Sequence, residues 1–247
     1  GRAGRGGDLL YRWGNPAVYR RGAAEAQTLF FQHDIHWTNP MARPGDPDFG
    51  QLAVFNNRVS PDSSTANLFR PPFEVDTWSY PIGSGAFGPG GFEETRFHPQ
   101  GPEKAISVSV SGMQVLPNGN WLICSGRWGY SYELTPAEEV VWEFVTPINK
   151  GRPATQGDVL AINDNLTFRL KRYAPDFPGF AGKELTPAGY IEHQPNEGFC
   201  GGLLSSTEPA PAVTGLRVNP NPAAGRLTVE HTVAAPLEAQ LLDLWGR

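Results

Sequence analysis

The motif QHDIHW, at positions 32–37, holds the densest group of potentially reactive side chains in this sequence. Its residues predict a β-strand, in which successive side chains point to opposite faces. His33 and Trp37 would then share one face. Asp34 and His36 would share the other, so the two histidines would not easily bind one metal ion. No metal site is therefore predicted.

Other polar clusters give no further candidates for catalysis. Three histidines are interpreted as surface residues: His98, His193 and His231. Glu138 and Glu139 begin a predicted strand, where neighbouring side chains point apart, so they indicate a solvated turn rather than an acid/base pair. The glycine clusters at 4–7 and 88–91 precede no helix and predict no phosphate-binding loop. No nucleotide cofactor is expected.

The two cysteines, Cys124 and Cys200, fit no metal-ligand spacing. Two interpretations remain open, namely two buried free thiols or one disulfide formed in an oxidising compartment. A disulfide requires Cα atoms within bridging distance, which the sequence does not establish.

Length and composition limit the class of protein. The chain of 247 residues is 39% hydrophobic, which is enough for one sizeable core or for one domain with a tail. Its 29 glycines and 24 prolines are typical of an all-β protein rich in turns. A net charge of −5 without a basic patch argues against a nucleic-acid partner. No apolar run reaches the roughly 18 residues of a transmembrane segment. Both ends look like interrupted sequence, so we expect a fragment of a longer protein.

Four short runs between positions 111 and 147 predict the structural unit that positions these residues. The first ends at Asn118-Gly119, a tight hairpin turn because Asn-Gly tolerates positive φ. The runs NWLICSG, YSYEL and VVWEFV follow. Four antiparallel strands within about 40 residues are typical of one β-propeller blade. Since a blade cannot bury both faces alone, neighbouring blades are expected.

A weak repeat of tryptophan-containing runs that end in proline, near Pro16, Pro81 and Pro147, predicts about two to three four-stranded blades. The preceding blade would consist of TLFFQHDIHW, QLAVFNN, LFRPPFEV and DTWSYP. Long loops are expected at 38–50 and 58–66, a mobile loop at 83–105, and one more strand at LTFRLKRY (166–173).

The segment LPNGNWLICSG followed by YELTPAEEVVWEF resembles the bacterial arylsulfate sulfotransferase family. GGDLLYRWGNP, QHDIHW and LAVFNN add to the resemblance, which covers 1–147. It implies a partial β-propeller of a probable six blades. It also implies a secreted enzyme that transfers a sulfuryl group from an aryl sulfate to a phenol.

The resemblance also implies a site. His33 matches a histidine that lines the sulfuryl site near the propeller axis, and it is the candidate catalytic residue. Arg58 lies close to the family's sulfate-binding arginine, although NNRVSP lacks the usual flanking glycines. A planar guanidinium suits two sulfate oxygens, and Asn57 could add a neutral donor. The alternatives are a hydrogen-bonded structural histidine and a solvated loop arginine.

One family residue is missing. The family's nucleophile is a histidine that carries the sulfuryl group covalently. The matching stretch, 121–134, contains Ser125, Arg127 and Tyr130 but no histidine. Arg127 could bind an anion but could not usefully be sulfurylated. A non-catalytic propeller that binds a glycan, peptide or small anion is therefore the alternative, and a structural surface protein is a third hypothesis.

The end of the chain changes in composition. The run SSTEPAPA (205–212) predicts a linker between the propeller, at 1–204, and a separate module at 213–247. That module resembles a truncated C-terminal sorting domain of the type IX secretion system, through NPNP, LTVEH and QLLDLWGR. A small β-sandwich and export by the type IX machinery to the cell surface or medium are implied. An ordinary small immunoglobulin-like domain is the alternative.

Overall fold

The computed structural model describes residues 6–7, 9–187, 189–196, 216–219 and 228–231. The chain divides into two compact units, Gly1–His193 and Gln194–Arg247. Within the described residues, regular structure consists of antiparallel strands and short 3-10 turns, without an α-helix. No helix there is long and apolar enough to cross a membrane. The prediction of an all-β fold is confirmed.

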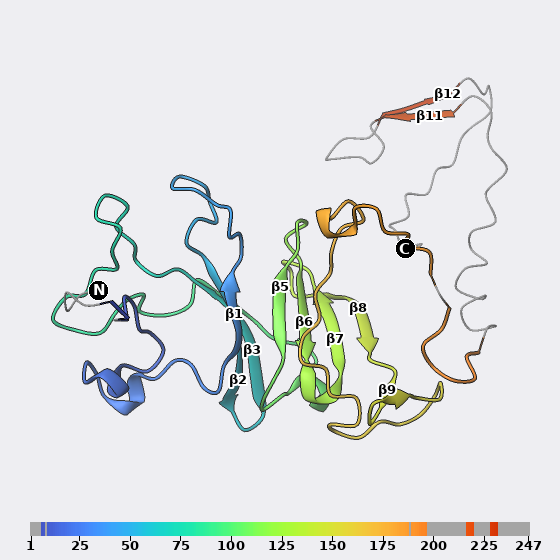
Figure 1. The fold of residues 1–247 in the computed structure, drawn as a ribbon, viewed down its shortest axis with the longest axis horizontal. Coiled ribbons are helices and arrows are strands. Elements are labelled where there is room, and N and C mark those ends of the chain that lie inside the picture. Colours follow the sequence, from blue (N-terminus) through green and yellow to red (C-terminus); the bar gives the residue numbers. More distant parts are fainter. Residues whose placement is uncertain (1–5, 8, 188, 197–215, 220–227, 232–247) are drawn as a thin grey trace. The chain divides into compact units, whose positions relative to one another are not determined.

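The first sheet contains β1 (His33–Trp37), β2 (Leu52–Ser60), β3 (Ser63–Phe69) and β4 (Glu94–Arg96), each paired antiparallel with the next (Figure 1). The strand predicted at 52–57 is therefore confirmed. Its apolar side chains alternate between two buried faces of the sheet, since Ala53 and Phe55 contribute to one core cluster and Leu52 and Val54 to another.

The second sheet contains β5 (Gly112–Val115), β6 (Trp121–Ser125), β7 (Tyr130–Leu134) and β8 (Val140–Val145), again in chain order. All four predicted runs form strands, although the first begins only at Gly112. The β5–β6 hairpin closes with Leu116 N–H donating to the carbonyl of Asn120, 2.8 Å away. Gly119 has φ of 83°, so the predicted turn is confirmed.

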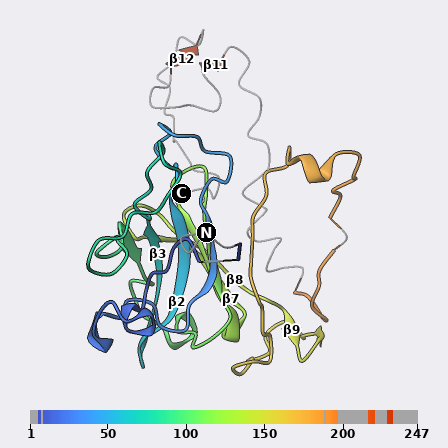
Figure 2. The same cartoon turned by 60° about the vertical axis from the view of Figure 1, so that its left-hand side comes forward.

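The two sheets pack against each other through one shared core (Figure 2). Phe55 and Leu68 of the first sheet belong to the same buried cluster as Met113, Ile123 and Tyr132 of the second. The other face of the first sheet is covered by the N-terminal segment. There Trp13 stacks on Phe69 with ring centroids 4.3 Å apart. Each sheet thus depends on its neighbours for burial.

Several boundaries predicted in the first sheet are wrong. The first strand begins at His33 rather than at Thr28. Between β2 and β3 only positions 61–62 form the turn, so 58–66 is not a long loop. The third strand is 63–69 rather than 68–75. Its polar side chains suit a buried strand because they are hydrogen-bonded, as when Ser64 Oγ donates to the Asn57 carbonyl at 2.7 Å.

The fourth strand, β4, lies inside the segment predicted as a mobile loop at 83–105, whereas 76–81 contains no strand. Arg96 explains why a charged run forms this strand. Its guanidinium lies 4.3 Å from the centroid of the Trp121 ring and 2.6 Å from the Glu94 carboxylate. Cation–π and ionic contacts allow the side chain to be buried.

The strand predicted at 166–173 is also not formed. Thr167 N–H donates to the carbonyl of Gly126, and the backbone of Arg172 bonds to the side chain of Gln114 instead of to a neighbouring strand.

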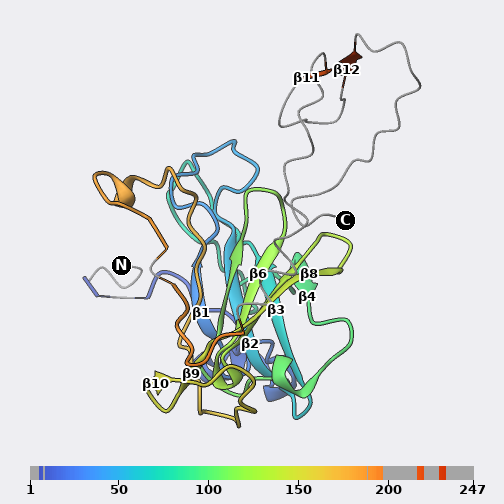
Figure 3. The same ribbon diagram turned by 90° about the vertical axis from the view of Figure 1, so that its right-hand side faces the viewer.

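The remaining elements of the first unit are short. They are the strands β9 (Ile148–Asn149) and β10 (Arg152–Pro153), which form a hairpin (Figure 3), and the 3-10 turns η1 (Pro16–Tyr19), η2 (Ala24–Ala26), η3 (Glu103–Ala105), η4 (Gly126–Trp128) and η5 (Pro178–Phe180). In the second unit, β11 (Leu216–Asn219) pairs antiparallel with β12 (Thr228–His231), which confirms the strand within LTVEH. The predicted linker at 205–212 and the predicted strand QLLDLWGR lie outside the described residues.

Candidate functional site

A cavity of about 750 Å³ opens beside β1, β5 and the segment that follows position 168. We call it the cationic cavity. Its lining includes Asp34, His36, Trp37, Arg169, Lys171 and Tyr173. It therefore combines two permanent cations with one carboxylate and one imidazole.

Asp34 holds the cavity together from within β1. It lies at an irregularity in the β1–β2 pairing, between His33 and His36, with φ of 57°, and its carboxylate is buried. Oδ2 accepts hydrogen bonds from Met113 N–H at 3.1 Å and from Lys171 Nζ at 2.9 Å. A Cβ at Gly112 would lie 2.3 Å from this oxygen, so only glycine admits the carboxylate there.

The two cations retain hydrogen-bonding capacity. Lys171 Nζ donates to Asp34 and, at 2.7 Å, to the carbonyl of Met113, and an ammonium has a third proton. Arg169 Nη1 lies 3.1 Å from Asp34 Oδ1, and the side chain is 45% exposed. Two positive charges thus share one carboxylate. The excess positive charge and the remaining N–H donors favour an anion, especially one with several oxygens.

His36 supplies a lone pair beside these cations. Its Nδ1 lies 2.7 Å from the backbone carbonyl of Asp34, and since a carbonyl only accepts, Nδ1 carries the proton. Burial lowers the pKa of this imidazole, opposed by that same backbone hydrogen bond. The neutral ring then has its lone pair on Nε2, which makes no hydrogen bond with the part of the chain that the structure describes.

His33, the predicted catalytic residue, lies elsewhere. Its Nδ1 is 2.8 Å from Asn57 Oδ1 and 3.0 Å from the carbonyl of Phe31, so it donates. Its Nε2 accepts from the N–H of Val110 at 3.3 Å. Both ring nitrogens are engaged, as in the alternative interpretation of a structural histidine. In this conformation His33 has no free nitrogen for attack.

Asn57 and Arg58 adjoin His33 but do not form an open pocket with it. Asn57 is fully buried, and its amide donates to the carbonyls of Ser107 at 2.6 Å and Val110 at 3.0 Å. Both amide protons are therefore engaged. Arg58 is exposed, stacks 3.9 Å from the centroid of Phe31 and donates from Nε to a backbone carbonyl. Neither residue lines the cationic cavity.

The segment 107–111, which we call the 107–111 loop, is the common partner of these residues. Arg127 reaches the same loop, because its N–H donates to Ser107 Oγ at 3.3 Å, while its Nε donates to Asn163. Val110 has φ of 53° and Ser111 of 84°, conformations unusual for residues with a side chain. The predicted sulfate-binding residues therefore surround a strained loop that their hydrogen bonds hold.

Two further predictions can be compared with the structure. Cys124 is a buried free thiol, and burial raises its pKa to about 11. Cys200 lies outside the described residues, so the pairing of the two cysteines stays a prediction.

His98 was predicted at the surface, and this is wrong. Only 7% of it is exposed, and its Nε2 lies 3.1 Å from the Tyr130 hydroxyl. The described residues contain no cluster suited to a metal ion.

Comparison with known proteins adds no assignment: no protein-family model matches the chain, and no curated protein or solved structure does so. The functional argument therefore rests on the sequence motifs and on the geometry of the cationic cavity.

Sequence reasoning missed Arg169 and Lys171. A signal was present, because residues two apart in an extended chain project to the same side.

Proposed function

We propose that this chain is part of a secreted arylsulfotransferase-like β-propeller protein that binds a sulfate ester in the cationic cavity. The observation that carries the proposal is the shared use of the Asp34 carboxylate by Arg169 and Lys171, which leaves excess positive charge and free donors at one site. Two sequential four-stranded sheets packed through a common core support the propeller architecture.

The cavity also contains a group suited to the chemical step. In the proposed reaction, the Nε2 lone pair of His36 attacks the sulfur of an aryl sulfate. The bond between sulfur and the aryl oxygen breaks, and the phenolate leaves with the bonding electrons and takes a proton from water. The ring keeps its Nδ1 proton, and the hydrogen bond to the Asp34 carbonyl stabilises its positive charge.

The second half-reaction returns the histidine to its initial state. An acceptor phenol attacks the sulfur, the nitrogen–sulfur bond breaks, and the phenol gives its proton to water. Arg169 and Lys171 would stabilise the negative charge that builds up on the sulfuryl oxygens in both steps. His36 would thus take the part of the nucleophilic histidine that is missing from 121–134, and it replaces His33 as the proposed catalytic residue. Arg58, Asn57 and Arg127 would support the neighbouring 107–111 loop.

The test is an assay of sulfuryl transfer from p-nitrophenyl sulfate to phenol, in which the rate is measured from the nitrophenol that is released. His36→Gln should remove turnover, and Arg169→Gln should lower kcat by roughly a hundredfold if it stabilises the transition state. The matched control is Arg58→Gln, an exposed arginine outside the cavity, which should leave turnover nearly unchanged. Turnover that survives His36→Gln would contradict the role of this histidine.

The missing histidine at 121–134 favours a second candidate, a non-catalytic propeller that binds a small anion. Calorimetry with p-nitrophenyl sulfate separates the two. Binding that depends on Arg169, without release of nitrophenol, would favour the binding protein. Absence of binding would contradict both candidates.

We also propose that residues 213–247 direct export by the type IX machinery, on the basis of their resemblance to its sorting domain. Deleting them from the parent protein should leave a folded product in the periplasm. Unchanged secretion, measured by immunoblotting of the medium, would contradict this role.

A further inference from the structure

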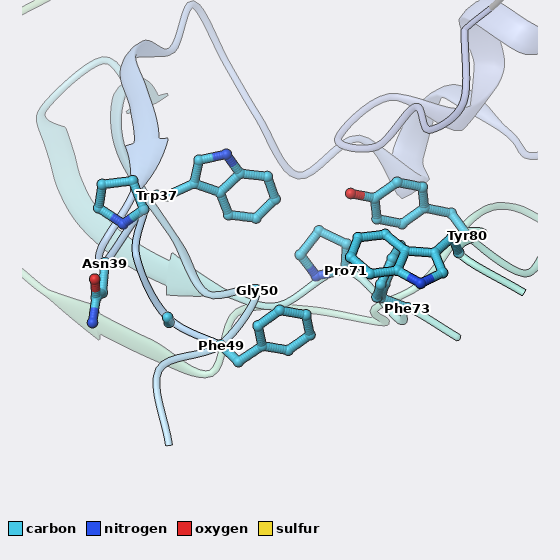
Figure 4. Close-up of a pocket in the computed structure, with 10 residues that line it drawn as sticks. Trp37, Asn39, Phe49, Gly50, Pro71, Phe73 and Tyr80 are labelled. Atoms are coloured by element: carbon cyan, nitrogen blue, oxygen red, sulfur yellow. The ribbon is translucent and has the colours of Figure 1, made fainter. Parts of the chain in front are cut away.

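Both cations of the cationic cavity belong to residues 168–173, a segment without a strand or a helix, which we call the cationic strap. Another wall of the cavity belongs to β1, where Trp37 pairs with Leu52 of β2. Figure 4 shows Trp37 at the edge of a second pocket that adjoins this strand. Strand pairing fixes the wall at β1, so the strap needs other contacts to hold Arg169 and Lys171 in place.

The last part of the strap is anchored to the second sheet by Arg172. Its guanidinium forms an ion pair with the buried carboxylate of Glu133 and lies 5.1 Å from the centroid of the Trp142 ring. Glu133 and Trp142 are register partners in β7 and β8. Leu122 of β6 partners both Glu133 and Gln114 of β5, so these residues form one row across the sheet. Arg172 therefore lies along this row.

Gln114 holds the backbone of Arg172 with both ends of its side-chain amide. Its Oε1 accepts a hydrogen bond from Arg172 N–H at 2.7 Å, and its Nε2 donates to the Arg172 carbonyl at 2.9 Å. The amide thus takes the place of the N–H and C=O groups of a neighbouring strand. The carbonyl of the preceding residue, Met113, accepts from Lys171 Nζ at 2.7 Å. Two consecutive residues of β5 therefore hold two consecutive residues of the strap.

These bonds matter for an anion in the cavity because lysine and arginine side chains have many rotamers to lose. If the strap backbone were free, Lys171 and Arg169 could leave Asp34, and a ligand would have to order them again at the expense of affinity. We propose that Gln114 is a positioning residue, which acts on the bound anion through Lys171 and Arg169. This inference rests on the proposed function and names a residue that prepares its site.

The first test is calorimetry with inorganic sulfate and with p-nitrophenyl sulfate on the 247-residue chain. Gln114→Met nearly preserves the length of the side chain and removes both hydrogen bonds to Arg172. It should weaken binding of each anion roughly tenfold, as expected for the loss of two bonds that order the site. The matched control is Gln100→Met, at an exposed glutamine outside the cavity lining, which should leave both affinities unchanged.

The outcomes separate this inference from the proposed function. If Gln114→Met binds both anions as tightly as the parent chain does, the positioning role is overturned and the proposed function stands. If the parent chain binds neither anion, the proposed function fails and the positioning role fails with it.

A double-mutant cycle tests whether Gln114 acts through the cations. With Lys171→Met already present, Gln114→Met should weaken sulfate binding by much less than tenfold, because a cation that it positions is gone. Losses that simply add would overturn the positioning role, since Gln114 would then act on the anion independently of Lys171.

Hydrogen exchange measures the strap without any ligand. In Gln114→Met the amide of Arg172 loses its acceptor and should exchange faster than in the parent chain, whereas the amides of β6 should keep their rates and show that the fold is intact. Unchanged exchange at Arg172 would mean that other contacts hold the strap, and this too would overturn the role of Gln114.

Discussion

Two polar regions meet along the short strand β1, and they differ in how completely their hydrogen bonds are satisfied. At the 107–111 loop, His33 uses both ring nitrogens and Asn57 uses both amide protons. In the cationic cavity, His36 uses one ring nitrogen, and Lys171 and Arg169 keep free donors. Residue type alone does not distinguish these regions, since each combines histidine with basic residues.

This difference in hydrogen bonding indicates which side chains are free to bind a ligand or to react. A group whose donors and acceptors are all engaged stabilises the fold, and a ligand would have to break those contacts. A group that retains capacity beside a cavity can bind or react. Variants should therefore separate the regions: changes at the loop affect stability alone, whereas changes in the cavity affect both stability and ligand binding.

The largest effect is expected for Asp34→Ala. Removing the buried carboxylate leaves Met113 N–H unpaired and two cations without their counter-charge. We expect a loss of about 3 kcal/mol in the free energy of unfolding, near the lower end for a broken buried pair because Arg169 can turn to water. Urea unfolding measures it. Added sulfate should stabilise this variant more than the parent, and an equal response would argue against an anion site. Asp62→Ala, at an exposed hairpin turn, is the control.

Asn57→Ala should follow, with a loss of about 2 kcal/mol, because two carbonyls and His33 lose their buried partner. The affinity for p-nitrophenyl sulfate, measured under conditions where the variant stays folded, should remain unchanged. If this variant instead bound p-nitrophenyl sulfate more weakly, Asn57 would contribute to ligand binding, and the proposed difference between the two regions would be wrong.

His98→Ala tests a third buried histidine that belongs to neither region. Loss of its hydrogen bond to the Tyr130 hydroxyl should lower the free energy of unfolding by about 1.5 kcal/mol. Thermal or urea unfolding checks this, with exposed His193→Ala as the control. An unchanged free energy of unfolding would contradict this prediction and show that the residues around His98 rearrange without a loss of stability.

The smallest effect is a pH dependence. Burial lowers the pKa of both His36 and His98 in the folded chain. Below the unfolded value of about 6.5, the unfolded chain therefore binds protons that the folded chain does not, and stability falls as the pH falls. Each proton contributes at most about 1.4 kcal/mol per pH unit. Replacing both histidines with glutamine should flatten the slope just below that pH, and an unchanged slope would assign it to other groups.

Much of the fold was predictable from local pattern. Asn118-Gly119 and the runs after it specify the second sheet, because turn chemistry and strand alternation act over a few residues. The first sheet was predicted less well, since β3 and β4 carry polar or charged residues whose burial depends on distant partners, as with Arg96 on Trp121. Composition does not reveal such partners.

The sequence by itself determined the all-β class, the hairpin at Asn118-Gly119 and the motif that places two histidines on β1. Tertiary structure alone decided which histidine keeps a free nitrogen, because that depends on Val110 and Asn57, which are distant in sequence from His33. It also brought Arg169 and Lys171 to Asp34 across more than half of the chain. Hydrogen bonds and ion pairs act over a few ångströms in space, whatever the separation along the chain.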